Sequence, residues 1–89
     1  MEAVFAAKSY RSGIMGGNTI QIVDPAELGA VIRNRRKEAG LNQKKLAALA
    51  HVGTRFLSEL ERGKPTAQLG KTLQILQLLG LELSIRPQS

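Results

Sequence analysis

Two short helical patterns separated by only three residues constrain the fold more than any other feature of this sequence. Asn42 is a residue type that caps helices, and the segment after it carries a narrow stripe of small apolar residues. A second apolar stripe starts at about Thr54. Because residues 51–53 are too few for an open loop, the two helices must join through a tight turn. The segment 42–63 therefore has the spacing of a helix-turn-helix unit, in which one helix packs across the other.

Another helix is predicted just before this unit. Asp24 can accept hydrogen bonds as the N-cap, Pro25 fits the first helical position, and Glu27 completes a capping box. Gly40 tolerates the left-handed conformation that often follows the last turn of a helix. The first helix is therefore expected over about residues 25–39.

A leucine-rich helix is predicted after the unit. Thr66 can cap this fourth helix, and Gly80 can end it. Its expected apolar stripe repeats at i, i+4 and i+7 and is then widened by three more residues: Leu69, Leu73 and Leu76, with Ile75, Leu78 and Leu79. A face this broad is expected to bury against a second copy of the chain.

Short strands are predicted on both sides of the four helices. Residues 19–23 and 81–86 alternate polar and apolar side chains, which favours β structure. Since an isolated two-stranded ribbon is marginal in water, the strands are expected to pair with each other, within a chain or across a dimer. The expected fold is mainly α, with four helices in a domain over 19–86. A flexible N-terminal tail (1–18) precedes this domain, and a short C-terminal end (87–89) follows it.

The composition argues against an enzyme. Eighty-nine residues make one small domain, the chain has no cysteine, and His51 is its only histidine. Metal sites built from thiolates or paired imidazoles are therefore excluded, and no carboxylates have the spacing that a hydrolase needs. Neither a metal nor a cofactor is expected. His51 is interpreted as a turn residue with a positive φ rather than as a ligand.

Positive charge is concentrated in one part of the chain. The net charge is +6, and residues 33–64 hold nine of the 13 basic side chains but only three of the seven acidic ones. Such a block favours a polyanionic partner, either nucleic acid or an anionic membrane surface. The alternative is a solvated basic face that only aids solubility. The longest apolar runs, about five residues, are too short for a membrane span or a signal peptide, so a cytoplasmic protein is expected.

Three pieces of the unit carry a family resemblance: Gln43-Lys44-Lys45-Leu46-Ala47, the apolar Val52, and Leu57-Ser58-Glu59-Leu60-Glu61-Arg62-Gly63-Lys64. Together they resemble the lambda/434-repressor-type (Xre-like) helix-turn-helix family, over about residues 28–80. The resemblance implies a DNA-binding protein of the bacterial cytoplasm, whose third helix reads bases in the major groove.

The same resemblance implies particular contacts with double-stranded DNA. The first exposed turn of the third helix would read bases, through Thr54, Arg55, Ser58 and Glu59. Arg55 is the best candidate, because a guanidinium can donate to both O6 and N7 of guanine. Glu59 could accept from cytosine N4, orient Arg55 or repel phosphate. The residues expected at phosphates are Gln43, Lys44, Gly53, Arg62 and Lys64.

Other matched positions are interpreted as structural. Arg36 and Glu61 correspond to a partly buried ion pair in the family, so Arg36 is discounted from the DNA-facing charge. Phe56 is expected to pack on the second helix rather than to touch a thymine methyl group. The chain departs from the family at Gly53, which stands at the N-cap of the third helix, and at His51, which replaces the turn glycine.

The C-terminal part of the chain, about residues 69–85, is similar to HipB-type antitoxins. In that family such a helix leads into a strand that pairs across a dimer, and the partner is a HipA-type serine/threonine kinase toxin. The resemblance thus implies a homodimer and places apolar residues in its interface: Leu76, Leu79, Leu81, Leu83 and Ile85.

Taken together, these features favour a dimeric, sequence-specific repressor that binds a palindromic operator. The resemblance to HipB implies that it is the autoregulating antitoxin of a HipA/HipB-type pair. Two alternatives stay open. One is a solitary phage- or transposon-type regulator without a toxin. The other is a protein-interaction adaptor that keeps the fold but no longer reads DNA.

Overall fold

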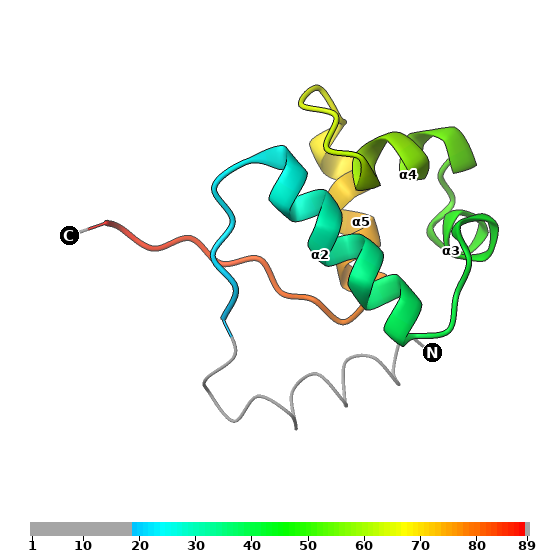
Figure 1. The fold of residues 1–89 in the computed structure, drawn as a ribbon, viewed down its shortest axis with the longest axis horizontal. Helices are drawn as coiled ribbons and strands as arrows, with labels where there is room; N and C mark the ends of the chain where they lie inside the picture. The colour runs from blue at the N-terminus through cyan, green and yellow to red at the C-terminus, as the bar shows by residue number, and fades with distance from the viewer. Residues whose placement is uncertain (1–18, 89) are drawn as a thin grey trace.

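The computed structural model describes residues 19–88 and forms four α-helices there (Figure 1). The helices are α2 (Pro25–Glu38), α3 (Gln43–Ala50), α4 (Thr54–Glu61) and α5 (Leu69–Leu78). This order confirms the mainly α, four-helix architecture with a helix-turn-helix unit formed by α3 and α4. The tail predicted over residues 1–18 lies outside the described residues.

One apolar core holds the four helices together. α2 packs on α4, while α3 packs on both α4 and α5. Because each helix is too short to be stable alone, burial of these shared apolar faces supplies most of its stability. The core residues, each at most 5% exposed, come from all four helices: Ile32, Leu46, Ala47, Ala50, Leu57, Leu60, Ile75, Leu76 and Leu79.

The capping box predicted at the start of α2 is only partly formed. The hydrogen bond to the Asp24 side chain is present, but the Glu27 side chain has a different partner. The N–H of Glu27 donates to Asp24 Oδ1 at 2.9 Å, so Asp24 is the N-cap. Glu27 Oε1 accepts instead from the N–H of Val23, at 2.8 Å, rather than from that of Asp24. The Glu27 side chain thus satisfies a donor one residue before the N-cap. At the other end, α2 stops at Glu38, one residue before the predicted bound.

The predictions for α5 are partly wrong. Gln68, not Thr66, is its N-cap, and the apolar stripe is rotated relative to the expected one. Leu69 and Leu73 are 66% and 40% exposed. The hydroxyl of Thr72 donates to the Gln68 carbonyl at 2.8 Å, so this polar residue can be buried with its donor satisfied. The stripe that faces the core is Thr72, Ile75, Leu76 and Leu79.

The described residues contain no β-strand, so pairing of the two predicted strands within one chain is wrong. Residues 19–23 and 81–88 are irregular, and the C-terminal segment leads away from the four helices (Figure 1). A strand is held by hydrogen bonds to a neighbour, and neither segment has one in the single chain. Their alternating apolar side chains are consequently exposed, up to 91% at Ile85.

Burial also corrects the predicted dimer interface. Leu76 and Leu79 are 5% and 0% exposed within the single chain, so they are core residues that a second copy cannot reach. Leu81 is half-buried and packs against the core. Leu83 and Ile85 are 55% and 91% exposed. Only the C-terminal part of the predicted interface is therefore free to contact another chain.

Candidate nucleic-acid interface

A sharp turn sets the angle between α3 and α4. His51 has φ 58° and ψ 42°, which confirms the predicted left-handed backbone at this position. The next N–H, that of Val52, donates to the Ala47 carbonyl at 3.0 Å and closes the end of α3. The residues that follow this turn, Gly53, Thr54 and Arg55, are exposed to solvent.

The N-terminus of α4 is open to solvent. Gly53 is its N-cap, as predicted, and no side chain caps the first N–H groups of the helix. A Cβ built at Gly53 would meet no atom within 4 Å. These free N–H groups and the positive end of the helix dipole favour a nearby anion such as a phosphate.

Three of the predicted DNA-contacting residues form one cluster on α4 and the turn after it. Arg55 Nε donates to Glu59 Oε2 at 3.2 Å, and Lys64 Nζ donates to Glu59 Oε1 at 3.0 Å. These hydrogen bonds, from Lys64 first and then from Arg55, lower the pKa of the Glu59 carboxyl. We call these three residues the α4 charge cluster.

The cluster residues differ in how far they reach into solvent. The Arg55 side chain is 91% exposed, whereas that of Glu59 is 24% exposed. Thr54 is also exposed, and Ser58 is half-buried one turn further along the helix. Of the four predicted base readers, Thr54 and Arg55 are therefore the two at the open surface of the first turn.

Apart from Gly53 at the N-cap of α4, the predicted phosphate-contacting residues fall into two groups. Lys44, Arg62 and Lys64 are exposed at helix ends. Gln43 is half-buried, and its Nε2 donates to Glu61 Oε1 at 3.0 Å. One of the two donors of this amide is thus committed to the protein, and the other is left for an external acceptor.

The ion pair predicted between Arg36 and Glu61 is present and buried. The two residues are 7% and 8% exposed, and they join the last turns of α2 and α4. Arg36 Nε lies 2.7 Å from Glu61 Oε2, and Arg36 Nη2 lies 3.0 Å from Oε1. Arg36 Nη1 also donates to the Leu41 carbonyl at 2.8 Å. Burial raises the pKa of Glu61, whereas the hydrogen bonds from Arg36 and Gln43 lower it. The lowering is the larger effect in total, so the pKa of Glu61 lies below its ordinary value.

A second structural arginine was not foreseen from the sequence. Arg35 Nε donates to the Leu79 carbonyl at 3.1 Å, and its Nη1 lies 3.0 Å from Glu38 Oε1. It therefore ties α2 to the end of α5, where a cation offsets the negative helix terminus. Its carbonyl partner is 44 residues away along the chain, and no local pattern signals such a contact. Arg35 as well as Arg36 is thus used inside the fold.

Phe56 is half-buried and packs against the core, and its packing on α3 stays a prediction. Lys71 Nζ lies 5.4 Å from the centre of its ring, a cation–π contact that links α4 to α5. Lys71 covers one face of this ring, and Arg55 is more exposed than Phe56 at the start of α4.

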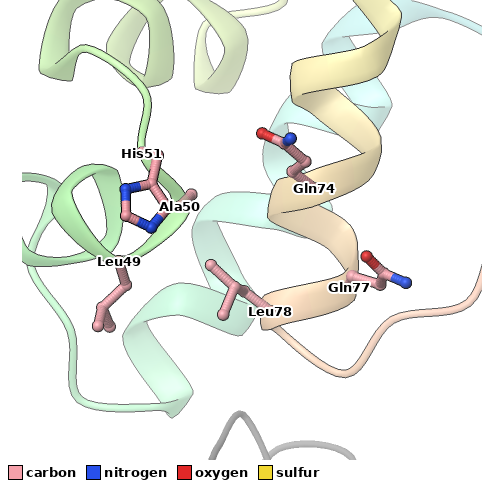
Figure 2. Close-up of a pocket in the computed structure, with 6 residues that line it drawn as sticks. All are labelled: Leu49, Ala50, His51, Gln74, Gln77 and Leu78. Atoms are coloured by element: carbon pink, nitrogen blue, oxygen red, sulfur yellow. The ribbon is translucent and has the colours of Figure 1, made fainter.

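A shallow pocket of about 370 Å³ opens between α3 and α5 (Figure 2). In Figure 2, Leu78 points from α5 toward α3, and His51 lies at the rim where α3 ends. The lining residues are Leu49, Ala50, His51, Gln74, Gln77 and Leu78. Within residues 19–88, no group of acidic, histidine or cysteine side chains is arranged to hold a metal ion. No helix in that range has the length and apolar character needed to cross a bilayer.

Comparison with known proteins agrees with this geometry. The sequence model of the helix-turn-helix domain matches residues 27–86, which include all four helices except the first two residues of α2. The chain belongs to the helix-turn-helix family. The HTH-type transcriptional regulator y4mF of Sinorhizobium fredii is 54% identical over 65 residues, which is 73% of this chain and 86% of the relative. The ImmF control region 10 kDa protein of Bacillus phage phi105 is 30% identical over 64 residues, 72% of this chain and 71% of that protein.

Solved structures of HipB have the same fold. A chain of the HipA–HipB–O2–O3 complex gives a TM-score of 0.72 at 22% identity, covering 80% of this chain and all of that one. This helix-turn-helix protein is therefore an Xre-like, DNA-binding transcriptional regulator with a HipB-like structure, and not an enzyme.

Proposed function

We propose that this helix-turn-helix protein is a cytoplasmic, dimeric repressor that reads a palindromic operator with α4. The observation that carries the proposal is the 91% exposed Arg55 side chain on the first turn of α4, beside the open helix end at Gly53. A guanidinium there can donate to guanine while the helix N–H groups meet a phosphate. Two copies of α4 would enter major grooves about 34 Å apart on one face of the duplex.

Fluorescence anisotropy tests this proposal. The purified chain is titrated against a labelled duplex from upstream of its own gene and against a scrambled duplex, over a salt series. We expect the upstream duplex to bind about 10³-fold or more tightly than the scramble. Equal and steeply salt-dependent binding to both would contradict operator reading, and would favour the adaptor alternative.

Two exposed cations near the interface are expected to act differently. Arg55→Ala should remove discrimination at one base pair in each half-site, by about 5- to 150-fold in affinity ratio. Lys44→Ala should weaken the upstream and scrambled duplexes alike and reduce the salt slope by about 1. Anisotropy with single base-pair variants of the upstream duplex measures both. An unchanged base preference in Arg55→Ala would remove Arg55 from the reading role.

The dimer is proposed to form through the C-terminal segment, where Leu83 and Ile85 are exposed in the single chain. Pairing of this segment with its copy would bury these side chains and supply the missing strand hydrogen bonds. Leu83→Glu is expected to shift the mass measured by sedimentation from dimer to monomer. Leu49→Glu is the matched control, since Leu49 is similarly exposed, at 49% against 55%. A dimer that persists in Leu83→Glu would place the interface elsewhere.

We further propose that the protein is the antitoxin of a HipA-type kinase. The support is the HipB-like fold and the HipB-like C-terminal sequence. A solitary phage-type regulator is the second candidate, and the 30% identity to the Bacillus phage protein favours it. The adjacent open reading frame separates the two. A kinase-like protein that copurifies with this chain supports the antitoxin, and a neighbourhood of phage genes supports the solitary regulator.

A further inference from the structure

We infer that Glu59 is a positioning residue that holds the Arg55 guanidinium for a guanine and does not itself read a base. This inference rests on the proposed operator reading and deepens it. It assigns guanine as the base class at one position in each half-site. It also separates Glu59 from the base-contacting set in which the sequence resemblance placed it.

The first support is how the Glu59 carboxylate is divided between two cations. Oε2 accepts from Arg55 Nε at 3.2 Å, and Oε1 accepts from Lys64 Nζ at 3.0 Å. The carboxylate thus engages Arg55 through one oxygen only, and its other oxygen accepts from Lys64. The pair therefore fixes the arginine through Nε alone. Among the described residues, nothing else binds the two Nη groups, which are the donors that match guanine O6 and N7.

The backbone after α4 brings Lys64 to this position. Gly63 has φ +90°, and the N–H of Lys64 donates to the Glu59 carbonyl at 3.0 Å. The chain therefore turns back so that the lysine lies over the residue whose carboxylate it binds. Lys64 thus holds the Glu59 carboxylate in place, and its remaining ammonium donors stay available for a phosphate.

Exposure distinguishes the positioning role from the reading role. The Glu59 side chain is 24% exposed and that of Arg55 is 91% exposed, so the arginine extends beyond the carboxylate that holds it. Much less of the Glu59 side chain than of the Arg55 side chain is therefore accessible to a base such as cytosine. Repulsion of phosphate by Glu59 is offset by the two cations on its oxygens. Both alternatives for Glu59 are less compatible with this geometry than the orienting role.

The cluster contributes little to folding, which makes its role in DNA binding measurable. Ion pairs at a solvent-exposed surface contribute little to the stability of a fold, because water screens the attraction between the charges. The isosteric variant Glu59→Gln should therefore fold normally, with a circular dichroism melt close to that of the wild type. Its effects on DNA binding then report on Arg55 rather than on the fold.

The test is a double-mutant cycle read by anisotropy on the upstream duplex, its single base-pair variants and the scramble. Glu59→Gln is expected to lower discrimination at the Arg55 base pair by about 5-fold or more, because a free arginine also contacts phosphates. Binding to the scramble should tighten, since one negative charge is removed. In the Arg55→Ala background, Glu59→Gln should no longer change discrimination at any base pair. Glu38→Gln removes the same charge outside α4 and controls for the change in net charge.

Two results would overturn the inference. One is a loss of discrimination from Glu59→Gln that is equally large without Arg55, or that maps to a different base pair, because Glu59 would then read a base directly. The other is unchanged discrimination in Glu59→Gln with Arg55 present. Failure of the proposed function looks different, because the wild type itself would then bind the upstream and scrambled duplexes equally.

Discussion

Glu61→Gln is expected to destabilise the fold by about 3–5 kcal/mol, because it leaves the buried Arg36 charge without its partner. Arg36 and Glu61 are 7% and 8% exposed, and two hydrogen bonds of 2.7 and 3.0 Å join them. The variant keeps the shape of the side chain and removes only its charge. The hydrogen bond from Gln43 to residue 61 also becomes weaker, because its acceptor is no longer charged. The contact between α3 and α4 is therefore weakened as well.

Urea unfolding at a fixed protein concentration measures this loss, since a dimer would make stability depend on concentration. Glu38→Gln is the matched control, because it breaks an arginine pair of similar length, 3.0 Å, whose glutamate side chain is 66% exposed. We expect the control to lie within about 1 kcal/mol of the wild type. Equal effects of the two variants would mean that the buried pair is no more important than a surface pair.

The pH dependence of the free energy of unfolding under acidic conditions provides a second test of Glu61→Gln. The pKa of Glu61 is lower in the folded chain than its ordinary value of 4.5. Its contribution to stability is therefore fully present above pH about 5 and is lost as the pH falls through the lower folded pKa. Glu61→Gln has no group to titrate there. Its free energy of unfolding should consequently fall less steeply with decreasing pH than that of the wild type.

The helix-turn-helix unit was predictable because its signals are local. Asn42 caps α3 through a hydrogen bond of 2.8 Å from the N–H of Lys45, and His51 takes the left-handed conformation that the three-residue turn requires. The ion pair of Arg36 and Glu61 followed from the family resemblance and not from any local pattern. Local chemistry determines caps and turns, so the spacing of α3 and α4 could be inferred without knowledge of packing.

Features that depend on packing could not be inferred in this way. Several leucines on α5 allow two overlapping stripes, and only contact with α3 selects the one that starts at Thr72. The Arg55–Glu59–Lys64 cluster also needs the turn after α4, which brings Lys64 back over the helix. Gly29 was not singled out at all, although an isolated glycine inside a helix pattern often marks a close contact.

Gly29→Ala is the second substitution with a large expected effect. Gly29 lies inside α2, where alanine would ordinarily favour the helix by about 1 kcal/mol. A Cβ at this position would lie 2.5 Å from the Leu60 carbonyl oxygen and 2.6 Å from that of Glu61. Both atoms belong to the α4 backbone, so the clash can be relieved only by separating the two helices. We expect a net destabilisation of about 2–3 kcal/mol, or a thermal midpoint lower by roughly 8–24 °C.

Gly70→Ala provides the matched control within the same chain. Gly70 also lies in a helix, α5, but a Cβ there would meet no atom within 4 Å. This variant should therefore gain up to about 1 kcal/mol from helix propensity alone. Thermal melts of the two variants at equal concentration should shift in opposite directions. A stabilising Gly29→Ala would mean that α2 and α4 do not cross as closely as the distances indicate.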